Sequence, residues 1–391
     1  MKALSFLIVP LVLSSINSLA SEANPITQID KFLKRHVDEI RKSENLVGLG
    51  AVVIQDSKII GLSVSGERKK GDGVLVSQQD LWHIGSITKS FTATMIARLI
   101  EKGDLKWDTS IKDVFPDEKD IHTEWNDVTL GNLLAHTSGA TPNFSLLVSL
   151  KNPNAGSERT AARESAVRYI LSQRPEVTPG GTFVYSNVGY TIAGVIAEKK
   201  AGVSWENLIR KEVFSPLGIE SGGFGAPKDI EGKLSQPWGH KKLFGFTKSG
   251  KDDNTPIIGP AGTIHLSLND LALYADEHLQ GIQGRSSFLK RESFQRLHHP
   301  NLNSYAYGWV IGPPEELGVG NVHWHNGSNT MWYALLVILP DINAAIAITS
   351  NDGNFKVSEY SAWEIVKRLA KPLEIAHKES MSLDAIKSTG Y

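Results

Sequence analysis

Ser86 and Lys89 are the first residues whose types and spacing indicate chemistry. They lie in Gly85-Ser86-Ile87-Thr88-Lys89. Residues three apart on a helix share one face, with about 5–6 Å between their Cβ atoms. A serine hydroxyl needs a base to become a nucleophile, and a lysine amine that is partly withdrawn from water can be that base. On its own, however, this short pattern more often means a capping serine beside a solvated lysine.

The segment Tyr185-Ser186-Asn187 follows a Pro-Gly pair and is typical of an extended turn. Residues two apart in an extended segment point the same way, so the phenol and the amide would face one point. The phenol could then share protons with Ser86, while the amide holds a substrate carbonyl or Lys89. A packed ring next to a turn-forming asparagine is the structural alternative.

The segment His325-Asn326-Gly327-Ser328 begins a strand near the end of the chain. Because Gly327 has no side chain, a ligand can lie against the strand backbone there. The backbone N–H of Ser328 could then pair with that of Ser86 as an oxyanion hole, two donors that stabilise the negative oxygen of a tetrahedral intermediate. An Asn-Gly hairpin turn with an incidental histidine is the alternative.

Taken in order, these three segments resemble the penicillin-recognising serine hydrolases. The chain is most similar to the branch that contains class C β-lactamases, D,D-carboxypeptidases, D-aminopeptidases and serine esterases. Further similarity lies in residues 128–139, which end in His136-Thr137-Ser138-Gly139, and in Pro260-Ala261-Gly262. The resemblance covers about residues 26–370. It implies a structural role for His136, where a helix turns into a loop.

The resemblance implies a role for each motif residue. Ser86 resembles the nucleophile that forms the acyl-enzyme. Lys89 resembles the amine that keeps the groups beside it ready to transfer protons. Tyr185 matches the general base that later returns its proton to the leaving group. Asn187 resembles the residue that anchors the lysine and the substrate amide. The backbone N–H groups of Ser86 and Ser328 correspond to the oxyanion hole.

The substrate-binding residues that the resemblance implies are Asn187, Gly327 and Ser328, with His325 as a further catalytic candidate. Class C β-lactamases have lysine at the position of His325. Histidine has an ordinary pKa near ~6.5, so at neutral pH it is mostly uncharged and attracts an anionic substrate less. A neutral imidazole can still complete a proton relay through Tyr185. This difference favours peptides or esters over β-lactams without excluding the latter.

The expected function is that of an exported serine hydrolase, which forms an acyl-enzyme at Ser86 from an amide or ester bond. Its partner would be a small-molecule or peptide substrate: a β-lactam, a D-amino-acid peptide or a short ester. Two alternatives remain open. One is a catalytically silent, penicillin-binding-like protein on the same fold, and the other is an acyltransferase or transpeptidase. The oligomeric state stays open.

Composition excludes several other classes. The 391 residues include no cysteine, which removes disulfide scaffolds, thiolate zinc sites and cysteine nucleophiles. The 41 basic and 42 acidic residues balance, so nothing indicates a nucleic-acid partner. His323 and His325 share a strand face, but zinc needs a third ligand. Neither a Gly-x-Ser-x-Gly elbow nor a nucleotide-binding glycine motif is present. We expect no metal and no cofactor.

The elements that position these segments follow from hydrophobic periodicity. Helices are expected over 26–42, 85–102 and 360–370, and strands over 46–54, 58–64, 305–310, 321–324, 332–339 and 344–350. Strands at both ends predict an α/β (α+β) fold: one antiparallel sheet flanked by helices and built from both termini. The resemblance implies that this is the β-lactamase/transpeptidase-like arrangement. Trp238, Trp324 and Trp332 are candidate cleft residues because they lie near the motifs in sequence.

The chain divides into three expected parts. Residues 1–20 have a basic start, an apolar run and small residues at 18 and 20, which is typical of a signal peptide. Residues 21–370 form the hydrolase domain, with a sheet subdomain at about 24–80 and 301–370 and a mostly helical insertion at about 81–300. Residues 371–391 are expected to be a polar tail. We therefore expect a periplasmic or secreted protein with no stable membrane anchor after cleavage.

Overall fold

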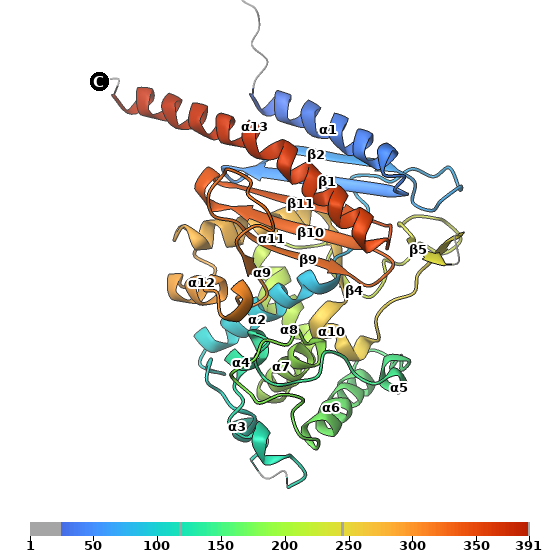
Figure 1. Ribbon diagram of the computed structural model, residues 1–391, viewed down its shortest axis with the longest axis vertical. Helices are drawn as coiled ribbons and strands as arrows, with labels where there is room; N and C mark the ends of the chain where they lie inside the picture. The colour runs from blue at the N-terminus through green and yellow to red at the C-terminus, as the bar shows by residue number, and fades with distance from the viewer. Residues whose placement is uncertain (1–24, 117–118, 244–245, 390–391) are drawn as a thin grey trace, which may run out of the picture.

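The computed structural model describes residues 25–116, 119–243 and 246–389, so the expected signal peptide lies outside the described residues. Its centre is an antiparallel sheet that takes strands from both ends of the chain (Figure 1). In spatial order the strands are β2 (Lys58–Gly66), β1 (Gly48–Gln55), β11 (Ala344–Ser350), β10 (Tyr333–Leu339), β9 (His323–Ser328) and β8 (Val310–Ile311). The predicted fold class is confirmed.

Helices cover both faces of this sheet. Helices α1 (Pro25–Ser43) and α13 (Phe355–Thr389) lie side by side on the outer face, and α11 (Leu268–Ile282) packs on the inner face (Figure 1). Alternate residues of β1 point to opposite faces of the sheet: Val53 contributes to the core on the outer face and Val52 to the core on the inner face. Strands covered on both faces are expected to be almost continuously apolar, as β10 and β11 are.

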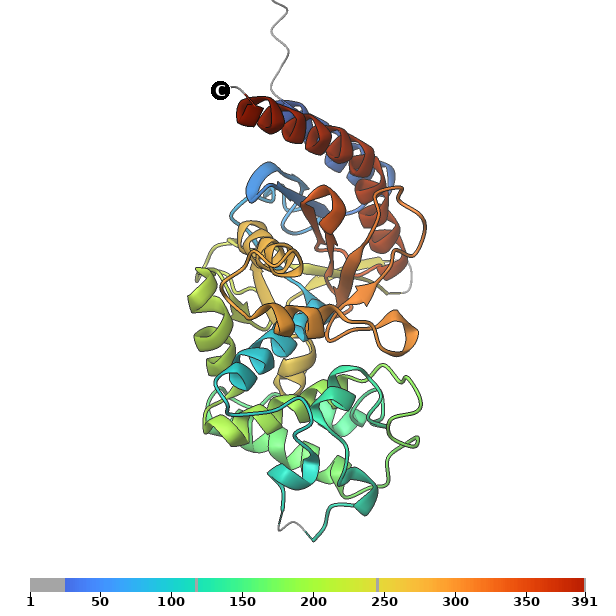
Figure 2. The ribbon, with the colours of Figure 1, turned by 90° about the vertical axis from the view of Figure 1, so that its left-hand side faces the viewer.

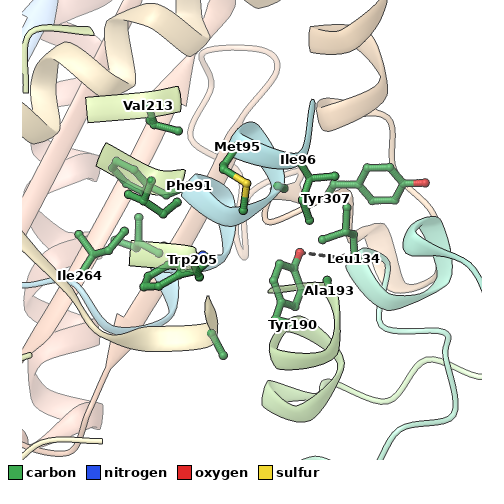
Figure 3. Packing of buried hydrophobic residues seen from close by; sticks show 14 of the residues in the cluster. Phe91, Met95, Ile96, Leu134, Tyr190, Ala193, Trp205, Val213, Ile264 and Tyr307 are labelled. Atoms are coloured by element: carbon green, nitrogen blue, oxygen red, sulfur yellow. Dashed lines mark hydrogen bonds between the residues drawn. The ribbon is translucent and has the colours of Figure 1, made fainter. Parts of the chain in front are cut away.

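The inner face of the sheet adjoins a larger helical region built around α2 (Thr88–Glu101) (Figure 2). Side chains of α2 are buried from Thr88 to Ala97, so this helix has almost no polar face to show to water. Phe91 of α2 stacks on Tyr274 with ring centroids 3.6 Å apart. Figure 3 shows Phe91, Met95 and Ile96 of α2 among the aromatic and aliphatic side chains that surround it. A helix held on all sides is a rigid support for residues at its N-terminus.

The remaining elements of the described chain include further helices, a small sheet and a hairpin. The small sheet contains β3 (Leu81–His83), β7 (Ile264–Ser267) and β4 (Gly223–Phe224), and the hairpin joins β5 (Gly239–Leu243) to β6 (Phe246–Gly250). The other helices are α3 (Ile111–Val114), α4 (Leu130–Leu134), α5 (Leu146–Ser149), α6 (Ser157–Leu171), α7 (Asn187–Ala201), α8 (Trp205–Ile209), α9 (Ser215–Leu217), α10 (Gly259–Gly262) and α12 (Arg291–His298).

Two expected elements differ from the structure. The closing helix does not end before a polar tail, because α13 continues from Phe355 to Thr389. The expected strand over 305–310 is not a strand: the chain turns back at Gly308, and of these residues only Val310, the first residue of β8, pairs with β9. In the part of the chain that the structure describes, no helix has both the length and the apolarity needed to cross a bilayer.

Candidate active site

Ser86 lies in a short 3₁₀ turn, Gly85–Ile87, that leads directly into α2. Its hydroxyl is half-buried, and its Oγ lies 3.1 Å from Nζ of Lys89, one turn later on the same face. Nζ also donates to Asn187 Oδ1 at 2.7 Å and to the backbone carbonyl of Ala261 at 2.8 Å. The structure therefore brings Ser86, Lys89 and Asn187 together, although they come from two distant parts of the sequence.

Lys89 is fully buried, and burial lowers its pKa well below the ordinary value, because a charged ammonium is costly to remove from water. A neutral amine has two N–H groups and one lone pair. Both N–H groups have a carbonyl oxygen to bond, on Asn187 and on Ala261. The lone pair of such a neutral amine would face the hydroxyl of Ser86, 3.1 Å away. These contacts would allow Lys89 to take the proton of that hydroxyl.

The Tyr185-Ser186-Asn187 segment is held at the start of α7. Ser186 caps this helix by accepting the N–H of Gly189 at 2.9 Å and donates to the carbonyl of Thr141 at 2.6 Å. Burial raises the pKa of the Tyr185 phenol, although a hydrogen bond with Ser86 partly opposes this shift. The phenol is therefore a proton donor at neutral pH, and its ring lies 4.7 Å from Nζ of Lys89.

Two glycines bring the expected oxyanion donors together. A Cβ on Gly85 would lie 2.3 Å from the backbone nitrogen of Ser328, and one on Gly327 would lie 2.5 Å from the nitrogen of Ser86. No side chain fits at these distances, so the end of β9 lies directly against the turn before α2. Gly85 also has φ +50°, a left-handed conformation that favours glycine. The nitrogens of Ser86 and Ser328 are neighbours for this reason.

Comparison with known proteins agrees with this geometry. A family model described as Beta-lactamase matches residues 33–371. The chain belongs to the β-lactamase family. It is 32% identical over 347 residues to penicillin-binding protein 4 of Amycolatopsis lactamdurans, which covers 81% of this chain and 84% of that relative. This chain spans only 58% to 62% of the length of several other curated relatives.

Solved structures show the same fold. A D-amino acid amidase of Ochrobactrum anthropi SV3, complexed with L-phenylalanine, aligns with a TM-score of 0.72 at 19% identity, over 90% of this chain and 99% of that chain. A class C β-lactamase aligns with a TM-score of 0.72 at 18% identity, over 88% of this chain and 97% of that chain. The expected family is confirmed, and this β-lactamase-family chain is a serine hydrolase.

Among the described residues of this β-lactamase-family chain, no hydrogen bond joins His325 to Tyr185. Its Nε2 lies 3.0 Å from the hydroxyl of Tyr305, and its Nδ1 lies 2.5 Å from the carbonyl of Asn326. Burial, with a smaller effect from nearby Lys89, lowers the pKa of His325 to about 3. The imidazole is therefore uncharged at neutral pH, with its Nδ1–H donated to Asn326 and its Nε2 accepting from Tyr305.

Sequence reasoning missed the part that Tyr305 plays in the site. It was expected inside a strand, where its side chain would have no reason to meet His325. Because the chain turns back after Tyr305, the phenol instead reaches the site, and its ring lies 6.2 Å from that of Tyr185. The turn uses a positive φ at Gly308. A glycine inside an apparent strand is the one local signal of this turn in the sequence.

His136 packs against the Tyr185-Ser186-Asn187 segment and supports the site. It is buried with φ +60°, and its Nδ1 accepts the backbone N–H of Ser186 at 3.0 Å. Its ring centroid lies 4.4 Å from that of Tyr185. Burial lowers the pKa of His136 well below the ordinary value, so the ring stays neutral. Its structural role was implied by the resemblance, but its contact with Tyr185 was not.

The remaining sequence candidates lie elsewhere. Trp332 is fully buried, and Trp324 faces the other side of the sheet, where it meets Trp363 of α13 at 5.2 Å, so neither lines the site. The indole of Trp238 donates to Asp229 at 2.8 Å. His323 contacts His298 rather than acting with His325. Among the described residues, no group of three or more His, Cys, Asp or Glu side chains is arranged so that it could hold a metal ion.

Proposed function

We propose that this protein is an exported serine hydrolase that acylates Ser86 with the carbonyl group of an amide or ester and then passes the acyl group to water. The environment of Lys89 carries this proposal. Its buried amine has an oxygen acceptor for each N–H of the neutral form and lies 3.1 Å from Ser86 Oγ. A solvated lysine beside a capping serine would have neither property.

The reaction follows from these contacts. As Ser86 Oγ attacks the carbonyl carbon, its proton passes to Nζ of Lys89, and the backbone N–H groups of Ser86 and Ser328 stabilise the oxyanion. The phenol of Tyr185 then gives its proton to the leaving nitrogen or oxygen, which breaks the scissile bond, and recovers one from Lys89. Water repeats the same steps in reverse order to release the acid and the free serine.

The substrate class we propose is a D-amino-acid peptide or a short ester rather than a β-lactam. The neutral imidazole of His325 offers no charge to a substrate carboxylate, because its pKa of about 3 lies far below neutral pH. Similarity to a D-amino acid amidase supports an amide substrate. The signal-peptide pattern of residues 1–20 supports export to a periplasm or to the medium.

Intact-mass spectrometry after exposure to a fluorophosphonate tests the nucleophile. We expect one adduct on the wild type and on Ser90→Ala, a matched serine variant on the same helix, and none on Ser86→Ala. We also test hydrolysis of a panel of β-lactams, D-amino-acid peptides and short esters. The hydrolysis that the wild type shows on this panel is expected to be lost in Ser86→Ala. An adduct or undiminished hydrolysis in Ser86→Ala would refute the proposal, as would a folded wild type that neither labels nor hydrolyses any member of the panel.

A further inference from the structure

The two donors of the oxyanion hole come from distant segments, the turn before α2 and the end of β9, and something must fix the distance between them. On the first side, the N–H of Gly85 donates to Nδ1 of His83 at 3.1 Å. His83 is fully buried at the end of β3. Its ring therefore holds the turn that carries Ser86, from two residues upstream.

The bond to Gly85 also decides which ring nitrogen of His83 carries a proton. Because Nδ1 accepts, a neutral imidazole must carry its hydrogen on Nε2. That nitrogen lies 3.0 Å from Oδ1 of Asp253. This pair is close but is not aligned as a hydrogen bond, since Nε2 of His83 has no hydrogen-bond partner among the described residues. The negative charge of the carboxylate beside this nitrogen still favours the orientation in which Nδ1 points at the turn.

The same carboxylate oxygen reaches the second side of the hole. Oδ1 of Asp253 accepts from Nδ2 of Asn329 at 2.8 Å, and Asn329 directly follows Ser328. The Oδ1 of Asn329 in turn accepts the N–H groups of Met331 and Trp332 at 3.1 and 3.0 Å, so its side chain shapes the turn after β9. Asn329 is itself buried.

A third contact ties Asp253 to the segment whose Ala261 carbonyl binds Lys89. Its Oδ1 also accepts the N–H of Asn254 at 2.6 Å, and Nδ2 of Asn254 donates to the carbonyl of Gly262 at 2.8 Å, next to Ala261. Oδ2 of Asp253 is buried and has no hydrogen-bond partner among the described residues. A largely buried carboxylate whose second oxygen has no partner is a costly way to join two loops that apolar contacts could also hold. A purely packing role would not require it.

We propose that Asp253 is a positioning residue that sets the spacing of the Ser86 and Ser328 N–H groups, through His83 on one side and Asn329 on the other. This inference rests on the proposed function, because only an acyl transfer needs both donors on one oxygen. Donors of this kind act only within a few tenths of an ångström of the developing oxyanion. Loss of the carboxylate is expected to loosen their spacing and to leave the nucleophile itself in place.

The test compares Asp253→Ala and Asp253→Asn with Asp252→Asn, a matched control at the neighbouring residue, whose exposed carboxylate pairs with Lys241 at 3.1 Å. Steady-state kinetics on the best ester or peptide of the panel is the first readout. We expect Asp253→Ala to lower kcat by about 100-fold, the typical cost of one oxyanion donor, and to change KM by less than about threefold. Asp253→Asn keeps an oxygen acceptor and is expected to recover most of the loss.

Hydrogen exchange measured by mass spectrometry is the second readout and does not depend on activity. In Asp253→Ala we expect faster exchange only in residues 83–87 and 327–330, on a protein with native circular dichroism. Exchange that rises uniformly, or kinetics like those of Asp252→Asn, would overturn the inference. If the wild type neither labels nor turns over, the proposed function fails, and the exchange data alone decide whether Asp253 holds the two segments together.

Discussion

The two groups nearest to Ser86 Oγ have pKa values shifted in opposite directions by one cause. Burial disfavours charge, so it lowers the pKa of the Lys89 amine and raises that of the Tyr185 phenol. Burial therefore favours the uncharged form of both groups, and an uncharged amine is the better base of the two. The resemblance implies Tyr185 as the base, whereas the geometry favours Lys89 as the base and Tyr185 as the donor to the leaving group.

This assignment predicts the pH dependence of kcat/KM. The rate should rise with pH as Lys89 loses its proton and should level off well below ~10.4, the ordinary pKa of lysine. Tyr185→Phe is expected to lower the plateau by about 100-fold to 10,000-fold without moving the rise, because the base is still present. Lys89→Met should remove the rise itself. A rise that disappears in Tyr185→Phe would identify the phenol as the base instead.

Sequence predicted the parts of the site that are set by local spacing. Ser86 and Lys89 meet because three residues separate them on a helix, and Tyr185 and Asn187 meet them because an extended turn points both to one side. The contact of His325 with Tyr305 depends instead on a loop that turns back, which no local pattern encodes. The contact of Lys89 with the Ala261 carbonyl could not be predicted either, because a backbone group has no signature in the sequence.

At the scale of elements, one buried arginine holds together the helices behind the site. Arg163 of α6 has no exposed surface and binds Glu198 of α7 and, at 2.7 Å, Glu206 of α8. It also donates to the carbonyls of Ile257 and Pro256, both at 3.0 Å. Those carbonyls lie just before α10, which supplies the oxygen that binds Lys89. The arginine therefore links three helices to the lysine pocket.

Arg163→Leu is expected to lower the free energy of unfolding by about 3–5 kcal/mol, because it leaves the buried carboxylate of Glu198 without its cation and removes the shorter of the two ion pairs of Glu206. Turnover should fall as well, since the segment before α10 loses two of its donors. Arg159→Leu is the matched control: Arg159 also pairs with Glu206, at 3.4 Å, but is partly exposed, and its loss should cost about 1 kcal/mol or less. Urea denaturation of both variants measures the difference, and equal costs would contradict the argument.

At the scale of the whole molecule, the antiparallel sheet built from both termini followed from the sequence, and the end of the chain did not. The polar pattern of residues 371–391 predicts a tail, although the chain also has Pro372 at this point, where a helix would lose a hydrogen bond. In the structure Leu373 is fully buried, and its carbonyl accepts from Nε2 of Gln55 at 3.0 Å. A tertiary contact with the β1 end of the sheet thus supports the helix past the proline, and such a contact has no local signal.

A row of buried histidines joins four elements across the molecule. Nε2 of His278 lies 3.1 Å from Thr94 on α2, its Nδ1 lies 2.9 Å from His298, and His298 lies 3.0 Å from His323 on β9. Each neutral imidazole offers one donor and one acceptor, so three uncharged rings satisfy every hydrogen bond of the row. Burial lowers the pKa of His278 to about 3 and that of His323 to about 4.

These shifts predict a steep loss of stability in mild acid. Unfolded histidines bind protons below ~6.5, whereas the buried rings stay neutral down to about pH 4, so the unfolded state holds more protons across this window. The stabilisation is therefore complete above ~6.5 and is lost as pH falls. Each buried histidine contributes a slope of up to about 1.4 kcal/mol per pH unit. Burial also lowers the pKa of His136, His298 and His325, so their slopes add to those of the other two.

Urea denaturation at several pH values between about 4.5 and 7.5 measures this slope. His278→Gln retains a group that can bond Thr94 and removes one titrating ring, so its slope should be smaller by up to about 1.4 kcal/mol per pH unit, whatever its stability at neutral pH. His299→Gln, at an exposed position, is the matched control. Because the slope reports protons and not packing, a cavity in the variant cannot imitate this result. A free energy of unfolding that stays level across the window would show that the buried rings take up protons without unfolding.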